Sequence, residues 1–268
     1  MSTGVAGDVT TTRYVYDAFG RLLQRYVGEA AGVKVEQNVY DGLGRLLSTL
    51  RSDGGATTYH YDDANHRAVV TYASGLVRTS VYDLAGEFLS VSDTEAGTLR
   101  AQTLYAYDAD GRLRMTTDPA GGRTLYLYDE LGRRVADVSP DGSLVEYVYD
   151  KAGRLRETIA YANRLDAAAI NGLLDANGKP RETIMVGQQQ VALTLDNAGL
   201  RPASSQDDRK AFNYYDNNDR LIRSVDAAGK ATDYVYDGTG QMARSVVYAT
   251  KVSASPGDTG TAAIASSA

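Results

Sequence analysis

Acidic residues are the most abundant groups in this chain that could do chemistry, since it carries 34 Asp and Glu but only two His and no Cys. Two acidic segments, Asp108 to Gly111 and Asp62 to Asn65, offer the oxygen ligands that Ca²⁺ prefers. Both lack the full ligand spacing and the terminal bidentate Glu of a calcium loop, so hydrogen bonding within a turn is the better interpretation. A carboxylate pair for glycoside hydrolysis is also disfavoured, because a catalytic site is singular and these acids recur at one place throughout the chain.

The two histidines, His60 and His66, are the remaining candidates for a general acid, a general base or a metal ligand. No Cys accompanies them and no Ser lies in a nucleophile elbow. We expect His60 to be a surface residue of a strand. We assign no catalytic, cofactor-binding or metal-binding residue, and we expect a chain that is not an enzyme and needs no cofactor.

An arginine follows the glycine of many acidic turns. These arginines could form a cationic stripe for a ligand, but local pairing with the turn aspartate is the favoured interpretation. Exposed pairs of this kind contribute roughly 0 to 1 kcal/mol each. The residues concerned are Arg21, Arg45, Arg112, Arg133, Arg154 and Arg220.

The turns belong to a repeat with a period of about 21 residues, which indicates a repeat architecture rather than an ordinary globular domain. Each copy begins with a Tyr-Asp pair, and the tyrosines are Tyr16, Tyr40, Tyr61, Tyr82, Tyr107, Tyr128, Tyr149, Tyr215 and Tyr236. The long gap between Tyr149 and Tyr215 contains Leu174-Asp175 and Leu195-Asp196, each with a Gly three residues after the Asp. We interpret Leu174 and Leu195 as tyrosine equivalents, facing the same side of the sheet as Tyr149 and Tyr215. This gives eleven modules and no second domain.

Each module is predicted to be two short strands with two turns. Alternation places Tyr14 and Tyr16 on one face of a strand, and we expect that tyrosine face to be the buried one. Asp followed three residues later by Gly is typical of a type I turn that ends in a left-handed residue. Where the Gly is missing, Asn65 or Asp219 stands in its place, and both types tolerate that conformation. Gly97 lies in a longer loop and is expected to tolerate substitution better than the turn glycines.

A second turn follows about ten residues later, for example at residues 118–121 and 226–229. The fold class is therefore all-β: tandem antiparallel hairpins forming a curved, spiralling sheet of about 22 strands, since a sheet this wide cannot stay flat. Less than about a tenth of the chain should be helical. One short helix is expected, from about Asn163 to Leu174. A short strip of such a sheet should have a poorly covered inner face.

Charge and hydropathy limit the partners. The net charge of −6 disfavours nucleic acid and anionic membranes. No run of 18 apolar residues exists, and Met1 to Thr12 lacks the regions of a secretory signal, so we expect neither membrane insertion nor a signal peptide in this chain. Three segments result: a flexible N-terminal segment at 1–12, the repeat sheet at 13–251 and a low-complexity tail at 252–268.

The motif resembles the YD-repeat or Rhs family from about Arg13 to Tyr248. The strongest copies are Tyr107 to Leu113 and Tyr149 to Leu155, whereas His66, Glu87 and Gln241 occupy the arginine position in degenerate copies. The resemblance implies a hollow β-sheet shell that encloses a toxic domain in insecticidal toxin complexes and Rhs polymorphic toxins. It further implies that the chain's partners are the remainder of a longer Rhs-type polypeptide and its cargo, secreted or at the cell surface. We find no self-cleaving core boundary and no toxin-sized region after the repeats.

The leading functional interpretation is a structural scaffold, part of a shell that encapsulates or presents a toxin or effector domain carried elsewhere. The alternative is a cell-surface binding module that recognises carbohydrate or protein through exposed tyrosines or rim loops. Length varies only in residues 27–33, 92–100 and 160–172, which follow the constant turns. We assign this variation to one rim of the sheet and expect any partner to bind that rim or the inner face, because loops carry recognition more often than the scaffold does.

Overall fold

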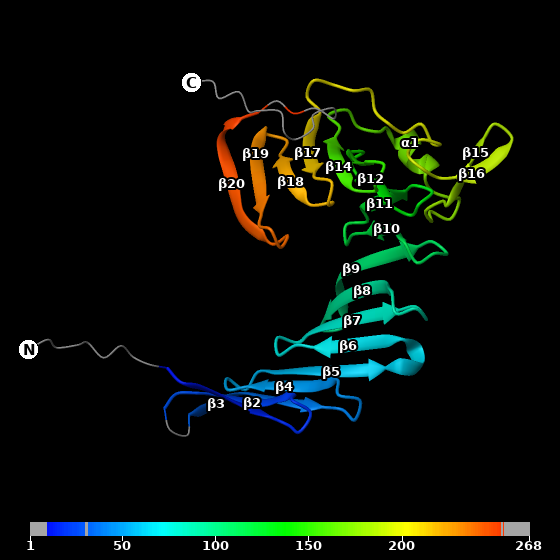
Figure 1. Ribbon diagram of the computed structural model, residues 1–268. Coiled ribbons are helices and arrows are strands. Elements are labelled where there is room, and N and C mark those ends of the chain that lie inside the picture. Colours follow the sequence, from blue (N-terminus) through cyan, green and yellow to red (C-terminus); the bar gives the residue numbers. More distant parts are fainter. Residues whose placement is uncertain (1–9, 30–31, 253, 255–268) are drawn as a thin grey trace, which may run out of the picture. The chain divides into compact units, whose positions relative to one another are not determined.

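A computed structural model describes residues 10–29, 32–252 and 254 (Figure 1). Most of the predicted N-terminal segment and of the low-complexity tail therefore lies outside the described residues. The chain divides into two units, Met1–Tyr105 and Ala106–Ala268. Within the described residues, no helix has the length and apolar character needed to cross a membrane.

The first unit is a meander in which each strand pairs antiparallel with the next along the chain. Its strands are β1 (Thr12–Tyr16), β2 (Leu22–Val27), β3 (Val33–Tyr40), β4 (Leu46–Arg51), β5 (Ala56–Asp62), β6 (Arg67–Thr71), β7 (Leu76–Tyr82), β8 (Phe88–Glu95) and β9 (Thr98–Tyr107), whose last two residues belong to the second unit. A single 3₁₀ turn, Asp63–Asn65, connects β5 to β6.

The second unit continues the same pattern, so that the chain forms one sheet of 18 strands. Its strands in that sheet are β10 (Leu113–Thr117), β11 (Arg123–Tyr128), β12 (Arg134–Val138), β13 (Leu144–Tyr149), β14 (Leu155–Ala160), β17 (Arg209–Tyr215), β18 (Leu221–Val225), β19 (Lys230–Tyr236) and β20 (Met242–Lys251). Every tyrosine of a Tyr-Asp pair lies at or one residue before the end of a strand. The all-β meander predicted from the repeat is confirmed.

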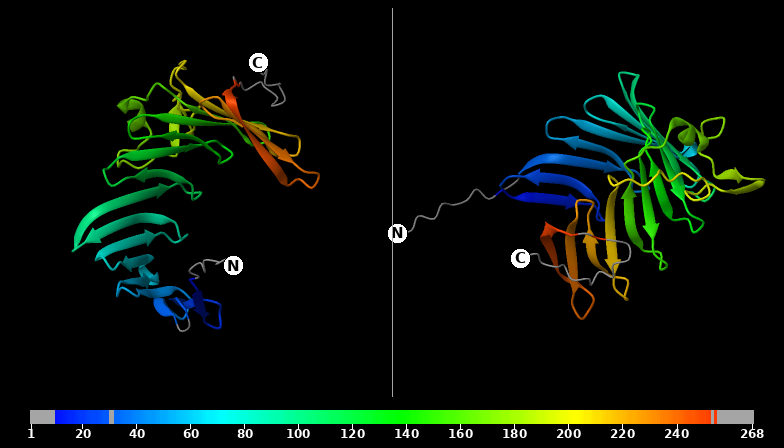
Figure 2. Two further views of the ribbon diagram at one scale, coloured as in Figure 1. Left: turned by 90° about the vertical axis from the view of Figure 1, so that its left-hand side faces the viewer. Right: turned by 90° about the horizontal axis from the view of Figure 1, so that it is seen from above.

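The prediction of eleven modules and about 22 strands is wrong, because β14 pairs directly with β17 and the sheet omits residues 161–208. These residues, here called the insert, contain α1 (Ala167–Gly172) and a separate hairpin of β15 (Thr183–Val186) and β16 (Gln189–Ala192). Figure 2 shows the insert beside the strands of its unit. Leu174 makes only an isolated bridge to Pro180, and Leu195 is in no strand. Neither residue takes the tyrosine position of the sheet.

The helix predicted at about Asn163 to Leu174 is confirmed in shortened form as α1. Its N-cap is Asp166, whose carboxylate accepts a hydrogen bond from the backbone N–H of Ala169 at 2.8 Å. Helix content across the described residues is therefore far below a tenth, as the repeat predicted.

The Tyr-Asp hairpins other than that of Tyr61 share one turn geometry. In the first, Tyr16 pairs with Leu22, the Gly20 N–H donates to the Asp17 carbonyl, and Gly20 has φ +78°. The pairing shifts by one residue beside Tyr16, which leaves a β-bulge. Asp219 takes the left-handed position at φ +62°, as predicted.

Two turn predictions fail. Asn65 is not the left-handed residue of its turn, because the 3₁₀ turn makes the loop longer and His66 adopts φ +49° instead. Gly97 has φ +76° and follows Ala96 at φ +48°. It is therefore as constrained as the other turn glycines, and the expected tolerance at this position is withdrawn.

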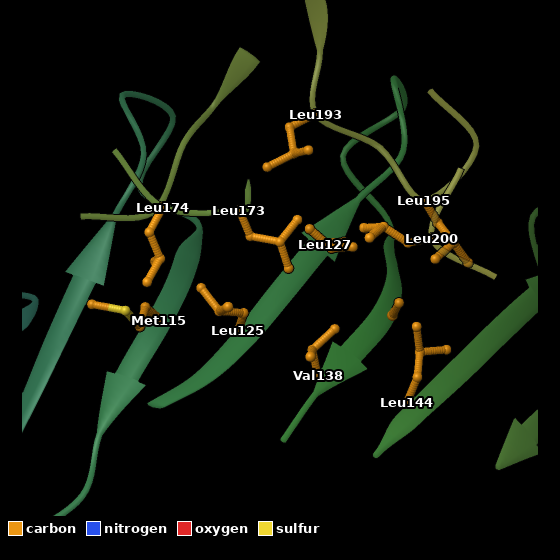
Figure 3. Close-up of a cluster of buried hydrophobic side chains, with 11 residues drawn as sticks. Met115, Leu125, Leu127, Val138, Leu144, Leu173, Leu174, Leu193, Leu195 and Leu200 are labelled. Atoms are coloured by element: carbon orange, nitrogen blue, oxygen red, sulfur yellow. The ribbon is translucent and has the colours of Figure 1, made fainter. Parts of the chain in front are cut away.

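The principal core lies in the second unit, between the insert and β10 to β13 (Figure 3). Leucines of the insert, such as Leu173 and Leu195, pack against Leu125, Leu127 and Leu144 of the sheet. Because side chains alternate along β11, these leucines face away from Tyr126 and Tyr128, which are only half-buried. The expectation that the tyrosines occupy the buried face is wrong here. In the first unit only Asn38 of the described residues is buried, so neither face of that unit has a covered core.

Candidate functional site: the aspartate, arginine and tyrosine edge

The regular turn binds an arginine side chain within its own hairpin. In the second module one carboxylate oxygen of Asp41 accepts hydrogen bonds from the backbone N–H groups of Leu43 and Arg45, at 2.9 and 2.8 Å. The other oxygen accepts from Arg45 Nε at 2.8 Å. All six predicted arginines make this ion pair, and the six distances run from 2.6 to 2.8 Å. Local pairing is confirmed over a free cationic stripe.

Each of these arginines also lies over the ring of the next tyrosine in the sheet. The distances from guanidinium carbon to ring centre are 4.8 Å for Arg21 and Tyr40, 4.3 Å for Arg45 and Tyr61, 5.5 Å for Arg112 and Tyr128, 4.6 Å for Arg133 and Tyr149, 4.8 Å for Arg154 and Tyr215, and 4.8 Å for Arg220 and Tyr236. Cation–π contacts of this kind contribute about 0.5 to 2 kcal/mol each. The turn of one module is thus attached to the strand of the next.

The tyrosine hydroxyl completes the attachment from the other direction. Tyr40 donates to the carbonyl of Leu22 at 3.0 Å, and Tyr236 donates to the carbonyl of Leu221 at 2.9 Å. The same bond is made by Tyr61, Tyr128, Tyr149 and Tyr215. The tyrosine rings of the edge therefore alternate with guanidinium groups rather than forming a continuous aromatic stack.

Three groups of the edge have shifted pKa values, and each shift favours the charge state that the group usually has at neutral pH. The hydrogen bond from Arg45 is the largest cause that holds the pKa of Asp41 below its ordinary value. Burial raises the pKa of Tyr61 and Tyr128, and burial with a hydrogen bond to Asp137 raises the pKa of Tyr147 to about 12. A general base near pH 7 needs a pKa close to 7, and these shifts run the opposite way.

The acidic residues of the two segments considered for calcium form ion pairs or hydrogen bonds with neighbouring side chains. Asp108 and Asp110 both pair with Arg112, each at 2.8 Å. Asp62 accepts from the side-chain amide of Asn65 at 2.8 Å, and Asp63 pairs with Arg45 at 2.6 Å. Across the described part of the chain no three His, Cys, Asp or Glu side chains gather as a metal site would require. His60 is exposed on β5, as predicted, and His66 ends the 3₁₀ turn.

A second polar site was not predicted from the sequence. Glu146 is buried on β13, where it accepts hydrogen bonds from the Tyr161 hydroxyl at 2.6 Å and from Arg201 Nη2 at 2.7 Å. Arg201 also pairs with Asp196. The two bonds to Glu146 hold the insert to the sheet beside a cavity of ≈ 450 Å³, lined by Asp129, Arg133, Tyr149, Asn197 and others. The clustering of leucines in residues 165–200 was the available signal that this segment covers an apolar face.

Arg114 of β10 contacts a different part of the insert and is also buried. Its Nη2 donates to the Arg181 carbonyl at 3.2 Å, and burial lowers its pKa. Its Nε has no hydrogen-bond partner. Arg114 and Glu146 are both charged residues of the sheet, and both form hydrogen bonds with the insert. The arrangement is a set of clamps, and it places no nucleophile beside a base.

Comparison with known families gives two matches. The Teneurin YD-shell model matches residues 2–166, and the RHS Repeat model matches residues 215–252. No curated protein sequence matches the chain.

Several solved structures match this chain. TcdB2-TccC3-TEV is 17% identical, with 89% of this chain and 16% of that chain covered and a TM-score of 0.38. The Photorhabdus luminescens Tc holotoxin pore is 16% identical, with 89% and 18% covered and a TM-score of 0.31. The chain spans less than a fifth of the length of these solved proteins.

Proposed function

The chain belongs to the Teneurin YD-shell family, and on that basis we propose that it is a structural scaffold, a strip of a β-sheet shell. In this proposal residues 13–251 form the repeat region. The shell encloses or presents a toxin or effector domain that is carried elsewhere. The strip's partners are the remainder of a longer Rhs-type polypeptide and its cargo, and the assembly acts outside the cell or at its surface.

The observation that carries this proposal is the side-chain attachment of six modules to the one that follows. The side chains that could otherwise do chemistry are committed to it: the turn aspartate binds its arginine, and the arginine covers the following tyrosine. Contacts between neighbouring repeats are how repeat proteins build extended surfaces of any length. A β-sheet shell needs such links between neighbouring modules in order to keep its curvature. A catalytic site does not need them.

Protease protection tests the proposal. The complete polypeptide encoded by the gene that contains these residues should be expressed and digested over time. We expect any non-repeat domain in it to be cut much more slowly than the same domain expressed alone. A matched variant with Arg133→Ala and Arg154→Ala removes two links between modules, and it should speed the cutting of that domain. Equal cutting rates for the enclosed and isolated domain would contradict encapsulation.

The binding-module alternative has one observation in its favour. Tyr14 and Tyr16 are 50% and 56% exposed, with ring centres 6.3 Å apart, and exposed tyrosines suit carbohydrate recognition. Both tyrosines, however, lie on β1, which among the described strands pairs only with β2. Their exposure is therefore expected of any edge strand in this repeat. Glycan binding that is lost in a Tyr14→Ser, Tyr16→Ser variant would favour the alternative.

We also propose that the chain alone catalyses nothing. Hydrolase, nuclease and transferase assays on the purified chain should show no turnover above the buffer. A turnover signal that a single Asp or Glu substitution abolishes would restore an enzymatic function. Glu146→Gln is the most informative first substitution, because Glu146 is a buried carboxylate beside a cavity.

A further inference from the structure

The arginines of the edge occupy a repeated binding cradle. Each guanidinium lies over the tyrosine ring of the next module, and four of the six also lie close to that module's left-handed glycine. A Cβ placed on Gly44 would lie 3.2 Å from Arg21 Nη1, and one on Gly132 would lie 3.3 Å from Arg112 Nη1. The corresponding distance at Gly153 is 3.6 Å, to Arg133 Nη1. Ring and glycine backbone together form a slot into which a planar cation fits.

The cradle of the fourth module, formed by Tyr82 and Gly86, has no such arginine. The sequence position that should supply it is His66, whose side chain is shorter and whose backbone is left-handed at φ +49°. Because this loop has one extra residue, Arg67 follows the left-handed residue, as arginine does in the regular turns. A Cβ placed on Gly86 would meet nothing within 4 Å, although its φ of +88° matches that of the other turn glycines. In the described part of the chain no cation lies over the Tyr82 ring.

A cavity of ≈ 570 Å³ occupies this place. It is lined by Tyr82, Asp83 and Gly86 of the fourth module and by Tyr61, Asp63 and His66 of the third, among others. On its far side Tyr82 contacts Phe88 of its own hairpin, with ring centres 4.7 Å apart. The face of Tyr82 toward the third module is therefore the one that the cavity leaves open.

Asp83 is the carboxylate of the cavity that could bind a cation. Asp83 accepts backbone hydrogen bonds from Ala85 and Glu87 through one oxygen, at 2.8 and 2.9 Å. Its other oxygen corresponds to the one that binds arginine elsewhere, but the arginine position of this turn is Glu87. Among the described residues, Asp83 makes no ion pair. Asp63 is already paired with Arg45, and Arg67 and His66 also line the cavity.

We propose that the open cradle of the fourth module binds the guanidinium group of an arginine side chain from another polypeptide segment. Six internal arginines show that a tyrosine face beside the next turn accepts a guanidinium, with the aspartate of the arginine's own turn as its ion partner. In the fourth module Asp83, which directly follows Tyr82, would supply the carboxylate instead. A guanidinium fits better than an ammonium group, because it is planar, stacks on an aromatic face and forms directed hydrogen bonds to a carboxylate. This inference is independent of the scaffold function, since it concerns one site and not the shell.

Titration with small probes, followed by backbone amide NMR of the purified chain at pH 7.5, tests the proposal. N-acetyl-arginine amide should shift the Gly86 and Asp83 amides saturably, with a dissociation constant on the order of 1 to 10 mM. N-acetyl-citrulline amide, which is neutral and of similar shape, should give no saturable shift, and N-acetyl-lysine amide should bind at least about threefold more weakly. The absence of saturable shifts with the arginine probe would overturn the proposal.

Variants locate the site. Tyr82→Leu should abolish the shifts at Gly86. Asp83→Asn should weaken binding about threefold to tenfold while the turn persists, because an amide oxygen can accept the same backbone hydrogen bonds. Tyr149→Leu is the matched control, since Arg133 already fills that cradle, and it should leave binding unchanged. Binding that survives both Tyr82→Leu and Asp83→Asn would contradict the assignment.

A last comparison distinguishes a polypeptide arginine from free arginine. The tripeptide Gly-Arg-Gly with blocked ends should bind more tightly than the free amino acid, whose carboxylate would lie near Asp83 and Asp63. Tighter binding of free arginine would overturn the assignment to a polypeptide segment.

Discussion

The guanidinium carbon of Arg133 lies 4.6 Å from the centre of the Tyr149 ring, while the same side chain binds Asp129 at 2.7 Å. One arginine thus joins its own turn to the strand of the next module. Neighbouring modules are linked at their edge by side chains as well as by the backbone ladder.

Removing this link should lower stability. We expect Arg133→Ala to cost about 1 to 2 kcal/mol of unfolding free energy, the combined range of a partly exposed ion pair and a cation–π contact. The midpoint of urea unfolding measures it. The control is Arg100→Ala, since Arg100 pairs with Glu95 but lies over no ring, and it should shift the midpoint by less than half as much. Equal shifts would show that the tyrosine contact contributes nothing.

The contact between the turn glycine and the arginine of the preceding module can be tested by adding a methyl group to the glycine. Gly132→Ala and Gly86→Ala each place a Cβ at positive φ, with a shared cost of about 1 kcal/mol. Only the Ala at position 132 would also displace a guanidinium, that of Arg112. We therefore expect the larger loss of thermal stability at Gly132. Gly97→Ala should resemble Gly86→Ala, because both backbones are left-handed.

The insert should depend on its buried ion pair. Arg201→Ala leaves the Glu146 carboxylate without its cation, and we expect a loss of about 1 to 3 kcal/mol. Hydrogen exchange should rise in residues 193–200 and stay unchanged in β17 to β20. Adding Glu146→Gln should recover part of the loss, since the remaining group is then neutral. No change in exchange within the insert would contradict the clamp.

Acid should weaken the edge. The folded-state pKa values of Asp17, Asp41 and Asp216 are lowered, the first and third mainly by hydrogen bonds from the arginine backbone N–H and the second mainly by the arginine side chain. Their stabilisation is present above the unfolded value of about 3.9 and is lost as pH falls through the lower folded values. Unfolding midpoints should therefore be flat from pH 7 to 5 and fall below about pH 4. An Asp41→Asn variant should be less stable at pH 7 and should lose less between pH 4 and 3.

The sequence predicted the sheet where its signals were local and repeated. The alternating residues before Tyr128 form a strand and residues Asp129 to Arg133 form a turn, each through local interactions. The hairpins and the six ion pairs could therefore be predicted. The arginine contact with the next tyrosine could not, because it depends on the register between modules. Asn65 was mistaken for the left-handed residue, since one extra residue in the loop moved that position to His66.

The insert was misread for a physical reason. Asp175 forms the same turn as the regular modules: its N–H donates to the Lys179 carbonyl and its own carbonyl accepts from Gly178. Turn chemistry is local and needs no sheet around it. The strand residues that should precede it, with Leu174 in place of Tyr, instead pack against Met115 and Leu125. A turn motif alone therefore does not establish that its flanks are strands.

The interruption at Tyr82 has a consequence for cooperativity. In a linear array that is stabilised by nearest-neighbour coupling, the free energy of each interface determines how far one repeat's unfolding spreads to the next. Between the third and fourth modules the backbone ladder from β6 to β7 remains, but among the described residues no guanidinium lies over the Tyr82 ring. Fraying that begins at β1 should therefore stop at this interface, so the first three modules would open as one block while β7 and β8 stay folded.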